Sequence, residues 1–216
     1  MVFDDNHPVV DNLAERLNQG INQLGLSATS EQQIKLMSLL EQLVKWNKTY
    51  NLTAIKNPME GLTLHLLDSL AVVPFIQHKN LLDVGTGAGF PGLPLAIMLP
   101  EVKFTLLDSN NKKIRFIRQQ VHLLDLVNVE VIHSRVEQQH NMSFDGIITR
   151  AFASLADMVT LTEHLLADSG SWLAMKARYV TDEIQTLPDN LQKVAHQPLN
   201  IPGLSAERCL IELKRR

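Results

Sequence analysis

The spacing of hydrophobic residues changes near residue 79, and this change divides the chain into two parts. Over residues 8–78 apolar residues recur at every third or fourth position, which is typical of amphipathic helices. We expect three helices there, the second opened by the capping hydroxyl of Thr29 and the third covering residues 59–76. The pattern therefore predicts a helical N-terminal extension, residues 1–78, that packs on the remainder of the chain.

Beyond this point, short β-rich runs alternate with helical ones. The expected strands cover residues 80–84, 103–108, 129–133, 144–149, 171–176, 191–197 and 208–213. Such alternation implies a mainly parallel sheet with helices on both faces and with ligands at the carboxyl ends of the strands. We therefore predict an α/β fold, with a doubly wound, mainly parallel seven-stranded sheet in residues 79–216.

The first predicted strand is followed by a glycine-rich turn over residues 85–92. Glycines permit a tight turn and a close approach of the backbone to a ligand. The second predicted strand ends in Asp108, whose carboxylate would be an acceptor for a pair of ribose hydroxyls. Together, the turn and the carboxylate predict a site for a nucleotide-like ligand.

The glycines of this turn fit two patterns, which indicate different cofactors. Gly87-x-Gly89-x-x-Gly92 matches the dinucleotide pattern of a dehydrogenase that uses a nicotinamide cofactor. Asp83-x-Gly85-x-Gly87-x-Gly89 matches a methyltransferase pattern. We favour the second, because a buried Asp83 would repel a pyrophosphate but would attract the α-amino group and sulfonium of S-adenosylmethionine. The dehydrogenase is the alternative.

Composition and charge restrict the class of protein further. A chain of 216 residues with 45% hydrophobic content can bury a full core, and it has no apolar run near the eighteen residues of a membrane span. The first residues lack the features of a signal peptide, and Cys209 is the single cysteine, so we expect a cytoplasmic protein. With a net charge of −3, any RNA binding must rest on a local basic patch.

Two further chemistries are disfavoured. We expect Cys209 in a late, buried strand, far from the carboxyl ends of the first four strands, where it would be a core residue and not a nucleophile. The eight histidines are scattered without the spacing of metal ligands, so we expect no metal.

Six segments stand out along the chain: residues 45–53, 65–69, 83–92, 107–109, 134–137 and 150–155. In this order they resemble the bacterial ribosomal RNA small-subunit methyltransferase G family, formerly called glucose-inhibited division protein B. The resemblance implies a Rossmann-like class I methyltransferase that transfers a methyl group from S-adenosylmethionine to N7 of one guanine in small-subunit (16S) ribosomal RNA. It also implies ribosomal RNA or the small ribosomal subunit as partner, and a monomer.

The resemblance and the positions on the predicted sheet together indicate cofactor-binding residues. These are Asp83, Gly85, Gly87, Gly89, Phe90, Asp108, Val136, Glu137 and Arg150. The three turn glycines would let the backbone approach the methionine part of the cofactor, with Phe90 over that pocket. Asp108 would accept from the ribose hydroxyls, and Val136 with Glu137 resemble the adenine-binding pair of the family.

Arg150, Arg135 and Lys176 are the predicted catalytic residues, because each lies near the carboxyl end of a predicted strand. An arginine at that edge would hold a phosphate or the O6 atom of guanine. For Arg150 the alternative is an ion pair that fixes a loop. His65 and Asp68, three positions apart, are either a functional motif or a structural hydrogen bond. The alternative for the whole chain is a non-catalytic RNA or ribosome binding module that keeps S-adenosylmethionine as a structural ligand.

Overall fold

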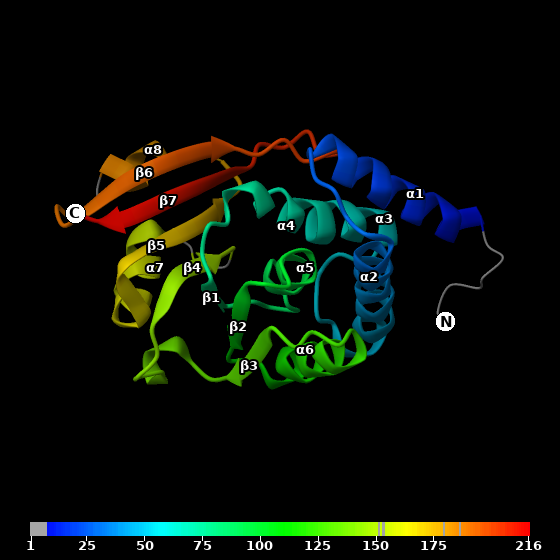
Figure 1. The fold of residues 1–216 in the computed structure, drawn as a ribbon, viewed down its shortest axis with the longest axis horizontal. Coiled ribbons are helices and arrows are strands. Elements are labelled where there is room, and N and C mark those ends of the chain that lie inside the picture. Colours follow the sequence, from blue (N-terminus) through cyan, green and yellow to red (C-terminus); the bar gives the residue numbers. More distant parts are fainter. Residues whose placement is uncertain (1–7, 151, 153, 179, 186) are drawn as a thin grey trace.

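A seven-stranded sheet is the central element of the computed structural model (Figure 1). The residues described are 8–150, 152, 154–178, 180–185 and 187–216. The strands are β1 (Asn80–Val84), β2 (Lys103–Asp108), β3 (Val129–His133), β4 (Phe144–Thr149), β5 (Leu166–Lys176), β6 (Leu191–Pro198) and β7 (Cys209–Arg215). Their order is β3-β2-β1-β4-β5-β7-β6, in which β1 to β5 pair in parallel and β7 is antiparallel to both neighbours. The predicted doubly wound, mainly parallel α/β fold is confirmed.

The N-terminal part begins with two long helices, α1 (Pro8–Gln23) and α2 (Ser30–Tyr50). Thr29 caps α2 as its sequence predicts: its Oγ1 accepts from the Gln32 amide at 3.2 Å, and Gln32 Oε1 accepts from the Thr29 amide at 2.9 Å. This exchange satisfies two of the backbone donors that a helix start leaves free.

The third predicted helix, residues 59–76, is wrong in detail, because the structure divides it into short pieces. These are α3 (Pro58–Gly61), a π-helical turn η1 (Leu62–Leu67), α4 (Asp68–Leu70) and, after a turn, the 3₁₀-helix η2 (Val73–Phe75). Periodicity predicts a helix but does not resolve a π-turn, which adds a residue to one turn without changing the apolar character of the segment.

The remaining helices connect the strands. They are α5 (Gly92–Met98), α6 (Asn111–Leu123), η3 (Val136–Gln138), α7 (Leu155–Thr162), η4 (Glu163–Leu165) and α8 (Thr181–Gln185). No helix among these residues or the rest of the described chain is long and apolar enough to cross a membrane.

Hydrophobic residues pack on both faces of the sheet, because neighbouring residues of a strand point to opposite sides. Leu81 of β1 and Phe104 of β2 belong to the cluster that also holds α2, α5 and α6. Leu82 and Trp172 belong to the cluster on the other face, with α7. The carboxyl ends of β1, β2 and β4 consequently form one edge, above which the π-turn and α4 lie (Figure 1).

The indole N–H of Trp172, fully buried under α7, donates a hydrogen bond that we expect to contribute measurably to the free energy of unfolding. Its Nε1 donates to Thr162 Oγ1 at 2.9 Å, and that hydroxyl donates to the Met158 carbonyl at 2.5 Å. Thr162→Val keeps the shape but leaves the indole N–H without an acceptor, so we expect a loss of about 1–3 kcal/mol in urea unfolding. Thr160→Val, at an exposed position of the same helix, is the control. Equal effects of the two changes would contradict this assignment.

Candidate functional site

The glycine turn after β1 requires left-handed backbone at three positions. Gly85, Gly87 and Gly89 have φ values of 66°, 65° and 91°, a region that side chains with a Cβ rarely adopt. The amides of Gly85 and Thr86 donate to the Leu107 carbonyl at 2.9 and 3.1 Å, which holds the turn against the end of β2. Gly87 and Gly89 belong to both glycine patterns, so the conformation of the turn does not by itself decide between them.

Asp83 lies directly beneath this turn and is completely buried. Its Oδ2 accepts from Thr86 Oγ1 at 2.6 Å and from the Gly92 amide at 2.8 Å. Burial raises the pKa of Asp83 to about 6, against the opposing effect of these two hydrogen bonds and of Arg150. The carboxylate therefore anchors both ends of the turn; its contact with a cofactor stays a prediction.

A Cβ at Gly92 would lie 2.0 Å from Leu106 Cδ2 and 2.7 Å from Asp83 Oδ2. Gly92 is thus required by close packing and not by a positive φ, since it is the first residue of α5.

Asp108 stands at the end of β2, as predicted, and borders a cavity of about 230 Å³. Its Oδ2 accepts from the Gly87 amide at 2.9 Å, and its Oδ1 accepts from the Asn110 amide at 2.8 Å. Val136 and Glu137 line the same cavity, Val136 buried and Glu137 exposed. The structure also places Arg135 here, exposed at the rim, and not in the cleft that holds Arg150.

A second cavity, a cleft of about 460 Å³, lies beside the first. Gly85 borders both cavities, so they adjoin at the glycine turn. Four basic side chains line the cleft: Lys113, Arg150, Lys176 and Arg208. The predicted site residues Arg150, Lys176 and Phe90 are thus brought together with the turn.

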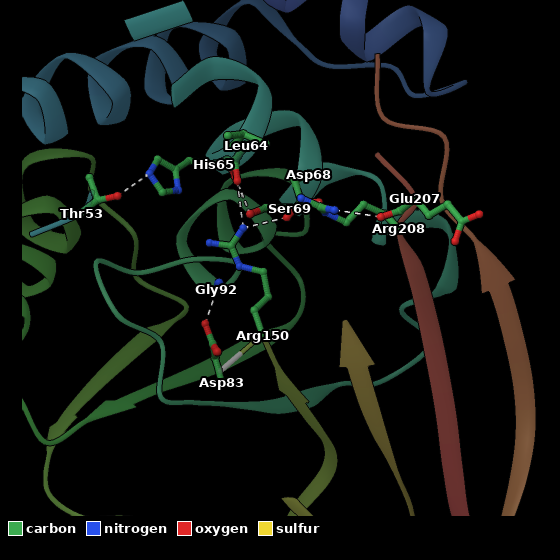
Figure 2. Close-up of polar contacts among 10 residues, drawn as sticks. All are labelled: Thr53, Leu64, His65, Asp68, Ser69, Asp83, Gly92, Arg150, Glu207 and Arg208. Carbon is green, nitrogen blue, oxygen red and sulfur yellow. Dashed lines mark hydrogen bonds and ion pairs between the residues drawn. The ribbon is translucent and has the colours of Figure 1, made fainter. Parts of the chain in front are cut away.

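Arg150 extends from the end of β4 toward the N-terminal helices (Figure 2). Its Nη1 donates to the Leu64 carbonyl at 3.0 Å and to Asp68 Oδ2 at 2.8 Å, and its guanidinium lies 5.9 Å from the centre of the Phe90 ring. Lys176 Nζ lies 3.3 Å from Glu183 Oε2. Both cations are therefore paired within the protein while they line the cleft.

His65 is a neutral, buried member of the same cleft. Its Nε2 is 3.0 Å from Thr53 Oγ1 (Figure 2). Its ring stacks on Phe90 with 4.7 Å between centroids. Burial, and secondarily the charge of Arg150, lowers the pKa of His65 to about 4. The suggested hydrogen bond between His65 and Asp68 is wrong for the described residues, since His65 pairs with Thr53 and Asp68 pairs with arginines.

Two features of β7 differ from expectation, for one reason. Cys209 was expected far from the carboxyl ends of the first strands, but it lines the cleft, and Arg208 beside it was missed altogether. Because β7 runs antiparallel to β5, its first residue lies beside Lys176, the last of β5. If the last strand had been recognised as antiparallel, its first residues would have been expected at the ligand edge of the sheet. Burial and Glu207 raise the pKa of the Cys209 thiol, which favours the expected inert role.

Comparison with known proteins identifies what the chain resembles. Residues 32–211 match the family described as rRNA small subunit methyltransferase G (GidB). A protein of that name from Stutzerimonas stutzeri is 50% identical over 210 residues, covering 96% of this chain and 98% of its own. One from Hydrogenovibrio crunogenus is 48% identical, covering 93% of each chain.

Solved structures show the same fold at low sequence identity. An O-methyltransferase from Bacillus cereus in complex with SAH superposes with a TM-score of 0.59 and 16% identity, over 96% of this chain and 100% of its own. A SAM-dependent methyltransferase from Thiobacillus denitrificans in complex with S-adenosyl-L-homocysteine gives 0.53 and 12%, over 81% and 97%.

The raised pKa of Asp83 predicts a pH effect on stability. Below its ordinary pKa of 3.8 the carboxyl is protonated in both the folded and the unfolded chain, and above about 6 it is charged in both. Wild type should therefore lose stability relative to Asp83→Asn as the pH rises through this window, by about 1–3 kcal/mol at about 1.4 kcal/mol for each pKa unit. Urea unfolding of both proteins from pH 3.5 to 7 measures the difference. A gap that is constant or widens with pH in favour of wild type would contradict the raised pKa.

Proposed function

The chain belongs to the rRNA small subunit methyltransferase G family, and from this premise we propose that it transfers a methyl group from S-adenosylmethionine to N7 of a guanine in small-subunit ribosomal RNA. One observation carries the assignment of chemistry to this site: Gly85 of the glycine turn borders both a cavity edged by Asp108 and a cleft lined by four cations. A cofactor in the first and an RNA nucleotide in the second would meet at Gly85.

The residues around the smaller cavity fit the adenosine part of S-adenosylmethionine. The Asp108 carboxylate lies at its edge for the ribose hydroxyls, and Val136 and Glu137 offer an apolar and a polar contact for adenine. Across the turn, Gly85 and Gly87 leave the backbone open to the methionine part. When bound, the cofactor supplies a sulfonium-activated methyl group.

The residues of the cleft fit a guanine that attacks through N7. This nitrogen has an exposed lone pair and loses no proton, so the protein needs to orient the base and not to deprotonate it. Arg150 lies where its remaining N–H groups would reach guanine O6 or a phosphate, and Lys113 and Lys176 add positive charge for the RNA strand. His65, neutral near pH 7, does not add a further cation beside the sulfonium.

The alternatives carry different weight. Membership of a methyltransferase family leaves no support for the dehydrogenase. Only a measurement of methyl transfer distinguishes a non-catalytic binding module from an enzyme. We infer that the partner is ribosomal RNA or the small subunit, that the location is the cytoplasm where this RNA is found, and that the protein acts as a monomer.

The cofactor assignment predicts that Asp108→Asn weakens S-adenosylmethionine binding, because the charged acceptor for the ribose is lost. We expect about 1–3 kcal/mol in titration calorimetry, equivalent to an increase in Kd of about five- to 150-fold. Asp125→Asn, at an exposed position outside both cavities, is the matched control. Equal affinities of the two variants would remove Asp108 from the cofactor site.

The function itself is tested by incubating the protein with radiolabelled S-adenosylmethionine and small subunits from a strain without the endogenous enzyme. Label should appear in 7-methylguanosine after digestion to nucleosides. Arg150→Ala should abolish most of this label, whereas Arg215→Ala, in β7 and outside both cavities, should keep it. Cofactor binding without any label would favour the binding module, and label in another nucleoside would exclude guanine N7.

A further inference from the structure

Asp68 occupies an unusual position at the end of the π-helical turn. Its backbone N–H donates to the Thr63 carbonyl, which closes the wide turn of η1. One additional residue in a helical turn rotates the next helical residues by about 100° relative to a regular helix, and such turns occur often at functional sites. Here the turn directs a carboxylate into the cleft, where Asp68 is one of the lining residues yet only 4% exposed.

Two arginines that flank different strands converge on this carboxylate (Figure 2). Arg150 Nη1, from the end of β4, lies 2.8 Å from Asp68 Oδ2. Arg208 Nε, from the residue before β7, lies 3.2 Å from Asp68 Oδ1, within ion-pair distance but without the alignment of a hydrogen bond. Asp68 thus joins an N-terminal helix to two separate edges of the cleft.

The accessible groups in this cluster are the cations and not the anion. The side chains of Arg150 and Arg208 are 24% and 23% exposed, against 6% for Asp68. Two guanidinium groups around one carboxylate leave a net positive charge. Within the described chain, no hydrogen bond uses Nη2 of either arginine, and a guanidinium has donors to spare for a phosphate.

We propose that Asp68 is a positioning residue that holds Arg150 and Arg208 side by side, so that their remaining N–H groups grip a phosphate of the RNA strand next to the target guanine. This inference rests on the proposed function. Two guanidinium groups that Asp68 already holds in place form a preorganised anion site. Two arginines without this partner would have to be ordered when the RNA binds.

A purely structural role for Asp68, as a link between helix and sheet, makes a different prediction. Loss of a structural link would lower thermal stability and would weaken cofactor binding and RNA binding together. Loss of a positioning residue would leave the glycine turn intact, because Asp68 contacts neither Asp83 nor Asp108 among the hydrogen bonds and ion pairs of the described residues.

The test is a double-mutant cycle of Asp68→Asn and Arg208→Gln, assayed with small subunits from the strain without endogenous enzyme. We expect D68N to lower kcat/KM for the subunit on the order of 100-fold, with the Kd for S-adenosylmethionine unchanged. The double variant should lose less than the product of the two single losses, because the residues act in one network. Asp168→Asn is the control: this exposed carboxylate lies 3.8 Å from Arg215, outside both cavities.

Each outcome decides the inference. The inference is overturned if D68N keeps the kcat/KM of wild type, or if the double variant loses the full product of the two single losses in kcat/KM. It is also overturned if D68N weakens S-adenosylmethionine binding in parallel. If D68N does not fold, R208Q alone decides, because it keeps the Asp68–Arg150 pair. R208Q should raise the KM for the subunit, and the salt dependence of this KM should fall by about one phosphate contact. Unchanged values would overturn the inference. A wild-type protein that never labels 7-methylguanosine would instead refute the proposed function, and the positioning role with it.

Discussion

The carboxylate of Asp83, buried at the end of β1, is the constraint on which the geometry of the site depends. Its Oδ2 is the common acceptor for Thr86 and Gly92, so both ends of the glycine turn are tied to one oxygen atom. Gly85 of this turn borders both cavities. A charge held without water is costly, and the raised pKa of Asp83 reflects that cost. The fold tolerates it because the turn needs a strong acceptor in that place.

A second buried carboxylate, Asp68, lines the cleft. The basic side chains around it show how a protein with a negative net charge would bind RNA. The chain has a net charge of −3, yet Lys113, Arg150, Lys176 and Arg208 line a single cleft. Net charge sums over the whole surface, whereas an RNA strand responds to the field where it lies. The prediction that RNA binding must rest on a local patch is consistent with this arrangement. Arg150 and Lys176 were among the residues predicted to act at the target, whereas Arg208 was not.

Much of the fold was predictable because its signals are local. Each of the seven strands was placed from a short apolar run, and the capping box of Thr29 and Gln32 was readable from hydroxyl and amide spacing. The glycine turn was predictable for the same reason: glycine adopts the left-handed backbone of Gly85, Gly87 and Gly89 more readily than residues with a Cβ. The convergence of Asp83 and Asp108 followed from the rule that parallel strands end at one edge.

The sequence by itself therefore determined the sheet, the glycine turn and the family, since each depends on residues close together in the chain or on their order. Only the tertiary structure decided which side chains pair across the cleft. The π-turn before Asp68 adds one residue within a segment that stays apolar, so it has no sequence pattern of its own. The antiparallel direction of β7, which brings Arg208 to the ligand edge, is set by packing against β5 and β6. Pairing over such distances depends on the relative placement of whole elements, and local propensity contains no information about it.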